Sequence, residues 1–185
     1  MSQYFSLLLM LFVLCVASSN SISAKVVDVD VICREASNPT YCSNLLNSKQ
    51  GGAKGVDLVD LAEYTIDVLS ENWTNTYNLI NKLINNAENS MVANYYYRCS
   101  IDFMNKDSVA NSLGDALLNL NIGNYPAMAK AITDVKQYLF DCIDSLRKNK
   151  TSPLLPKYVD VLQQVISLRI ISFSSFGGTV LSNGH

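Results

Sequence analysis

The sequence predicts an all-α protein, an up-down-up-down four-helix bundle with an N-terminal helical hairpin and two disulfides. Four long segments carry apolar residues at every third or fourth position, the spacing of a helix with one buried face. No stretch of any length alternates apolar and polar residues, so a sheet is not expected. Four cysteines follow a leader-like N-terminus, and they supply the cross-links.

Three of the four long helices are expected over Asp57–Ala87, Ser90–Leu120 and Pro126–Arg147, and the fourth is expected to start near Ser152 and to continue until Gly177-Gly178 stops it. Asp57 can cap the first helix, and Pro126 suits a first helical turn because its missing N–H would have no partner there. The polar run from Asn105 to Ser108 is expected to kink the second helix or to bulge out of it. Short links between amphipathic helices favour an antiparallel bundle.

A short helical hairpin is expected upstream, over Val29–Leu46. Its turn contains the pair Asn38-Pro39. A proline disfavours helical geometry in the residue before it, and an asparagine in that position is suited to cap the next helix.

The N-terminus has the layout of a secretory signal peptide. Residues 7–17 read LLLMLFVLCVA, which is apolar but too short to span a bilayer, and small residues follow. We predict a signal peptide over 1–24 that is cut between Ala17 and Ala24; the alternative is an uncleaved anchor. The remaining chain is expected to form one domain over 25–176 and a flexible tail over 177–185.

Cysteine usage indicates two disulfides in an oxidising compartment. Outside the leader the cysteines are Cys33, Cys42, Cys99 and Cys142, and four cysteines allow three pairings. Cys33 and Cys42 flank the tight turn of the hairpin. Cys99 and Cys142 lie on apolar faces of adjacent antiparallel helices, each about twenty residues from the turn near Gly123, and so at matching height. Helix geometry therefore favours Cys33–Cys42 and Cys99–Cys142.

Composition and motifs argue against several functions. The net charge is −2, so no basic excess attracts nucleic acid or an anionic membrane. The only histidine is His185, and no zinc, nucleotide or hydrolase motif is present. We therefore expect no catalytic residue, metal site or cofactor, and the paired aspartates at i, i+3 spacing are interpreted as solvated helix faces.

Two further features concern the surface. Asn72 and Asn149 begin Asn-X-Thr triplets and are predicted glycosylation sites if the chain is secreted. Successive helical residues are about 100° apart, so Tyr95, Tyr96 and Tyr97 cannot all face the core. Tyr95 and Tyr96 share the side of Cys99, which leaves Tyr97 pointing elsewhere, and exposed tyrosine is favoured at binding hot spots.

The stretch ICREASNPTYCSNLL and the helix opening DLVDLAEYTID, with the four-cysteine layout, resemble the plant family of invertase and pectin methylesterase inhibitors. The resemblance covers about residues 26–173. It implies a four-helix bundle with an N-terminal hairpin and disulfides between the first and second, and the third and fourth, cysteines. In this chain Leu113 and Ala116 fit the family pattern only after an insertion of about three residues, which we place at Asn105–Ser108.

The resemblance also implies a function. Members inhibit cell-wall enzymes, either by covering the substrate cleft of pectin methylesterase or by inserting a Pro-Lys-Phe element into acid invertase. This chain lacks that element and has Gly123-Asn-Tyr-Pro-Ala-Met128 in its place, which is closer to the Gly-Asp-Tyr of many pectin methylesterase inhibitors. The sequence therefore favours pectin methylesterase, with acid invertase as the alternative.

We expect a secreted inhibitor in the plant cell wall, or in the vacuole if the target is a vacuolar invertase, that forms a one-to-one complex with its enzyme. Tyr97, Arg98, Asp102 and Lys136, on the second and third long helices, are the candidate contact residues. A different class of function is a secreted carrier of a small apolar ligand such as a lipid. It would need a cavity along the bundle axis, and bulky residues such as Trp73, Phe103, Leu139 and Phe173 argue for a filled core.

Overall fold

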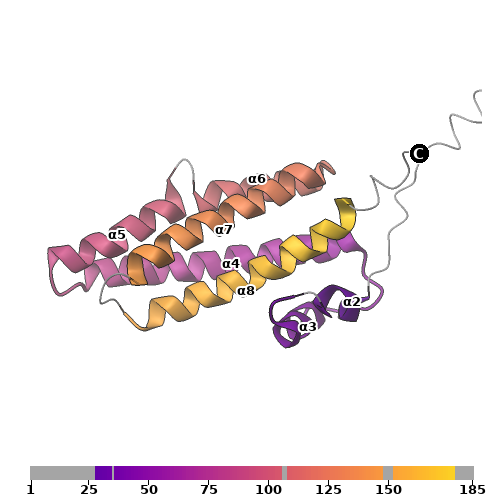
Figure 1. The fold of residues 1–185 in the computed structure, drawn as a ribbon, viewed down its shortest axis with the longest axis horizontal. Coiled ribbons are helices and arrows are strands. Elements are labelled where there is room, and N and C mark those ends of the chain that lie inside the picture. Colours follow the sequence, from indigo (N-terminus) through magenta and orange to yellow (C-terminus); the bar gives the residue numbers. More distant parts are fainter. Residues whose placement is uncertain (1–27, 35, 106–107, 148–151, 178–185) are drawn as a thin grey trace, which may run out of the picture.

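The structure is a computed structural model that describes residues 28–34, 36–105, 108–147 and 152–177. The predicted signal peptide over 1–24, the glycosylation acceptor Asn149 and all of the predicted tail except Gly177 lie outside the described residues. Within them the chain is helical, and the helices form a bundle with a smaller hairpin against one end (Figure 1).

The hairpin consists of α2 (Val29–Arg34) and α3 (Pro39–Asn47). Asn38 is the N-cap of α3: its side-chain oxygen accepts a hydrogen bond from the backbone N–H of Tyr41 at 3.1 Å. This satisfies one of the donors that the first turn leaves without a partner. The predicted cap and the helical hairpin are therefore confirmed.

The first long helix is α4 (Leu58–Asn85). Asp57 caps it, accepting a hydrogen bond from the N–H of Asp60 at 2.9 Å. Its buried residues recur at helical spacing and include Leu61, Ile66, Leu69 and Ile80. The periodicity therefore predicted both the helix and the face that it buries.

The second long segment is two helices, α5 (Ser90–Met104) and α6 (Val109–Asn121), where the apolar pattern predicted one continuous helix with a kink or bulge. The interruption falls in the polar run that the sequence singled out. Asn105 ends α5 and Ser108 begins α6, both with extended backbone geometry. The Asn105 backbone N–H donates to the Ile101 carbonyl at the end of α5, and the buried Ser108 side chain makes no capping hydrogen bond at the start of α6.

The third and fourth long helices are α7 (Tyr125–Arg147) and α8 (Leu154–Gly177), each starting within two residues of the predicted position. The turn between α6 and α7 depends on Gly123, whose φ of 73° lies in the left-handed region that other residues rarely adopt. Gly177 belongs to α8, so this helix extends one residue into the predicted tail.

The long helices run antiparallel, with α5 and α6 following one another along the same side of the bundle (Figure 1). Helix α4 contacts α5, α6 and α8, and α7 contacts α5, α6 and α8, which closes the bundle. The main core contains fully buried Phe103, Met128, Leu139 and Leu162 along its length. Burial of these apolar side chains is the main stabilising contribution to the fold.

Two disulfides cross-link this architecture. Cys33 is bonded to Cys42 across the hairpin turn, with 5.4 Å between their Cα atoms. Cys99 of α5 is bonded to Cys142 of α7, with 4.6 Å between their Cα atoms. This is the pairing that helix geometry favoured. The second bond fixes the height of α5 relative to α7.

Across the described part of the chain, no helix combines the length and the apolar character that crossing a bilayer requires.

Candidate binding surface

The candidate contact residues on α5 lie on two different edges of that helix. Tyr97 is exposed, with 56% of its surface accessible, while the neighbouring Tyr96 is buried and its hydroxyl accepts a hydrogen bond from the Ser152 N–H at 2.7 Å. Arg98 and Asp102 are one turn apart and share an edge. Tyr97 and Asp102 are five residues apart, which places them about 140° from each other around the helix.

Asp102 lies at the seam between α5 and α7. It is only partly exposed, and burial, followed by the nearby Asp141 carboxylate, raises the pKa of Asp102 from 3.8 to about 6. The Asp141 carboxylate on α7 accepts a hydrogen bond from the Gln137 side chain at 3.0 Å. The disulfide one turn away holds the two helices in this register, so the two acidic side chains stay close.

This arrangement predicts a pH-dependent effect of Asp102→Asn. Because the fold raises the pKa, ionised Asp102 destabilises the folded state above pH 6, and that cost disappears as the pH falls through 6 toward 4. The full pKa shift would correspond to a destabilisation of the folded state by about 3 kcal/mol. Solvent screening of a half-exposed carboxylate reduces this destabilisation to about 1 kcal/mol. Urea unfolding should therefore show Asp102→Asn to be stabilising at pH 7.5 and neutral at pH 4.

Asp115→Asn, on the exposed face of α6, is the matched control for that experiment and should be neutral at both pH values. An equal gain from Asp102→Asn at pH 4 and pH 7.5 would show that the carboxylate charge is not the cause.

Lys136 lies apart from Asp102, on the other edge of α7. It is exposed and borders a groove between α7, α8 and the hairpin turn, whereas Asp102 of α5 lies near Asp141, on the edge of α7 that faces α5. The structure therefore does not bring the four candidate residues into one cluster. They are spread over a surface formed by α5 and α7.

Phe140 is an exposed aromatic residue that the sequence analysis did not single out. It lies one turn after Lys136 on α7 and keeps 47% of its surface accessible. The sequence could have predicted that Phe140 is exposed. The apolar stripe of this helix passes through Leu139, Ile143 and Leu146, and position 140 lies outside it. An exposed phenylalanine on an otherwise polar face is a candidate contact residue.

The predicted glycosylation acceptor Asn72 lies within α4 and is partly buried. Its side-chain amide nitrogen, the atom that would carry a glycan, donates a hydrogen bond to the Val68 carbonyl at 2.8 Å. Glycosylation at Asn72 stays a prediction.

The part of the chain that the structure describes contains no group of three or more His, Cys, Asp or Glu side chains arranged to hold a metal ion.

Fold and surface together define a class of protein: a four-helix bundle locked by two disulfides, whose candidate site is an exposed helical surface. No family model matches the sequence. The chain is 23% identical over 163 residues to pectinesterase inhibitor 2 of Arabidopsis thaliana, covering 88% of this chain and 90% of the relative. It is 29% identical over 122 residues to a pectinesterase inhibitor of Actinidia deliciosa, covering 66% of this chain and 64% of that relative.

Solved structures give the same result for the fold. A mutant form of a pectin methylesterase inhibitor from Arabidopsis superposes with a TM-score of 0.70 and 18% identity, over 79% of this chain and 95% of the other. Another crystal structure, of a pectin methylesterase inhibitor from Arabidopsis thaliana, superposes with a TM-score of 0.60 and 18% identity, over 79% of this chain and 93% of the other. The two sequence relatives support one family, that of the plant invertase and pectin methylesterase inhibitors, and the solved structures show the same fold.

Proposed function

We propose that this protein is a secreted inhibitor of pectin methylesterase, which binds the enzyme one-to-one and covers its active-site cleft. The observation that carries the proposal is the similarity to a pectinesterase inhibitor along 88% of the chain. The leader layout of residues 1–24 and the use of four cysteines in disulfides support a location outside the cell, in the plant cell wall.

The fold supports inhibition by occlusion. Two disulfides and a filled core pre-organise the helices, and a pre-organised surface loses less conformational freedom when it binds. Inhibition of this kind requires a shaped surface and no catalytic group. The exposed or partly exposed side chains of α5 and α7, among them Tyr97, Arg98, Asp102 and Lys136, are the proposed contacts.

The start of α7 supports pectin methylesterase over acid invertase. The family resemblance associates invertase inhibition with a Pro-Lys-Phe element before this helix, and this chain has Gly123-Asn124-Tyr125-Pro126 instead. Here Gly123 turns the chain, and the Asn124 side-chain oxygen accepts a hydrogen bond from the Ala127 N–H at 3.4 Å. Tyr125 packs partly buried against the core, so this segment forms a helix start and not a projecting loop.

An inhibition titration tests the proposal. The purified mature protein is added to a plant pectin methylesterase and, separately, to a plant acid invertase, each at acidic and at neutral pH. We expect pectin methylesterase activity to fall to its minimum near one equivalent of inhibitor, and invertase activity to stay unchanged. Inhibition of invertase alone would reassign the target, and inhibition of neither enzyme would refute the proposed function.

Tyr97→Ala tests the contact surface on α5. A large, half-exposed tyrosine with two rotatable bonds is a favourable interface anchor, and truncating such an anchor weakens binding by about tenfold or more. We expect Tyr97→Ala to raise the inhibition constant by at least that factor without lowering the melting temperature. Tyr158→Ala on α8, where the tyrosine is 42% exposed, is the matched control and should inhibit like the unmodified protein.

A further inference from the structure

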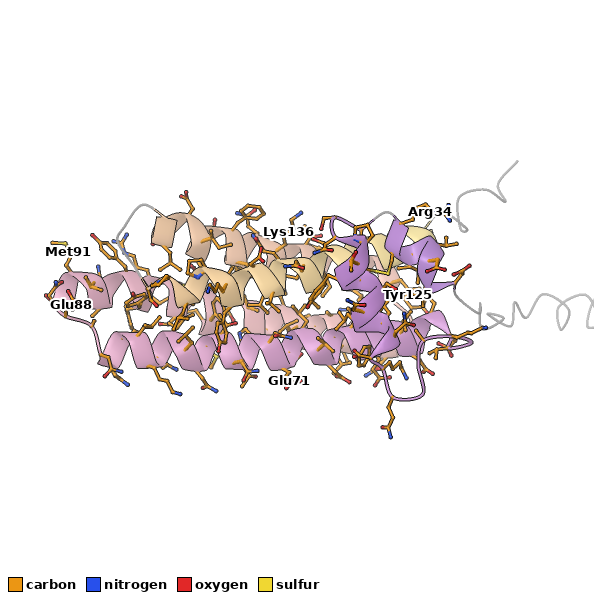
Figure 2. The ribbon with its side chains drawn as sticks, turned by 90° about the horizontal axis from the view of Figure 1, so that it is seen from below. Arg34, Glu71, Glu88, Met91, Tyr125 and Lys136 are labelled. Carbon is orange, nitrogen blue, oxygen red and sulfur yellow. A yellow bond between two sulfur atoms is a disulfide. The ribbon has the colours of Figure 1, made fainter. Side chains whose placement is uncertain are left out.

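A groove of about 260 Å³ lies between α7, α8 and the turn of the hairpin. Its walls include Lys136 and Phe140 from α7, Asp160, Gln163 and Gln164 from α8, and Ser37 from the hairpin turn. Figure 2 shows Lys136 on the side of the molecule against which the hairpin lies, while Met91 and Glu88 mark the far end of the bundle.

The hairpin wall of the groove is held in place by a chain of hydrogen bonds. The Asn38 side-chain amide donates to the side-chain oxygen of Gln164 at 3.1 Å, and the Gln164 amide donates to the Asp160 carboxylate at 2.9 Å. The Cys33–Cys42 disulfide closes the hairpin behind Asn38. This wall is therefore positioned before any partner arrives, which limits the ordering cost of binding.

The α7 wall offers a cation beside an exposed aromatic ring. Lys136 is exposed and forms no ion pair with any residue in the described part of the chain. The carboxylate of Asp160, on the opposite wall, already accepts the Gln164 hydrogen bond. Phe140 is 47% exposed one turn from Lys136. A partner that supplied a carboxylate and an apolar side chain would satisfy both residues.

We propose that this groove receives a loop of the inhibited enzyme, which places a carboxylate on Lys136 and an apolar side chain against Phe140. The proposed partner is an enzyme, so the occupant of the groove is a segment of its polypeptide chain. The inference rests on the proposed function and deepens it: it assigns Phe140 as an anchor and gives the hairpin a role as one wall of the contact surface.

Two variants with two matched controls test this inference. Lys136→Glu reverses the charge of the cation on the α7 wall, and Phe140→Ala removes the exposed aromatic ring beside it. Lys82→Glu, near the C-terminal end of α4, and Met91→Ala, at the start of α5, make the same kinds of change on exposed side chains away from the groove. Dissociation constants for pectin methylesterase are measured by calorimetry, alongside the melting temperature of each variant.

We expect each groove variant to bind at least about tenfold more weakly than the unmodified protein, with an unchanged melting temperature, and both controls to bind normally. Normal inhibition by Lys136→Glu and Phe140→Ala would overturn the groove inference and leave the proposed function standing. If the unmodified protein binds neither pectin methylesterase nor acid invertase, the inference falls with the function on which it rests. A dimer in light scattering that only the groove variants dissociate, with inhibition intact, would assign the groove to a second copy and also overturn it.

Discussion

Replacing Cys99 and Cys142 together with alanine is expected to lower the free energy of unfolding by about 4 kcal/mol. The bond joins residues 43 positions apart in the sequence, on α5 and α7, and both sulfur-bearing residues are fully buried. In the chain-entropy model, opening a loop of this length gives the unfolded chain far more freedom than it gives the folded one. Alanine avoids placing an unpaired hydroxyl in the core.

Urea unfolding at neutral pH measures this change, and the Cys33→Ala/Cys42→Ala variant is its control. The hairpin disulfide closes a span of only 9 residues, so its loss is expected to cost about 2.5 kcal/mol by the same model. Equal losses for the two double variants would contradict the loop-length argument, and a negligible loss for Cys99→Ala/Cys142→Ala would show that packing alone holds α5 against α7.

Phe103→Ala is expected to destabilise the protein by about 3 to 5 kcal/mol, an effect as large as that of the disulfide. Phe103 is fully buried in the main core, next to the point where α5 ends. Truncating it removes a large apolar side chain and leaves a cavity that the surrounding helices fill only in part. Chemical denaturation followed by circular dichroism measures the loss.

Met104→Ala is the paired control, because Met104 follows Phe103 directly yet keeps 48% of its surface exposed. It is expected to change the free energy of unfolding by less than about 0.5 kcal/mol. If the two substitutions had similar effects, the assignment of one neighbour to the core and the other to the surface would be wrong.

Much of this fold follows from local patterns. Apolar residues at helical spacing predicted the long helices, and Asp57 and Asn38 predicted two caps that the structure forms with backbone N–H groups. Cys99 and Cys142 each lie about twenty residues from the turn at Gly123, and that similarity was sufficient to predict their pairing, which the structure forms. Each of these features involves one helix or two helices that are adjacent in the sequence. The spacing of apolar and capping residues predicts structure over that range.

The rest depends on contacts that periodicity does not encode. The apolar stripe continued across Asn105 to Ser108, so it did not distinguish a kinked helix from two separate ones. The pattern also shows which face of a helix is exposed but not which neighbour borders each edge. Asp102 and Lys136 were therefore grouped together, although Asp102 of α5 lies near Asp141 of α7, and Lys136 of α7 borders α8 and the hairpin.

The hairpin packs against one end of the bundle through a second, smaller apolar cluster, which it shares with α4 and α8. Ile32, Cys42 and Leu46 pack there on Leu61 of α4 and Leu168 of α8. A unit with a distinct cluster and its own covalent closure can open and reclose while the remaining helices stay folded. We therefore expect native-state amide exchange to reveal two cooperative units, with the backbone amides of α3 exchanging through a lower-energy opening than those of α4.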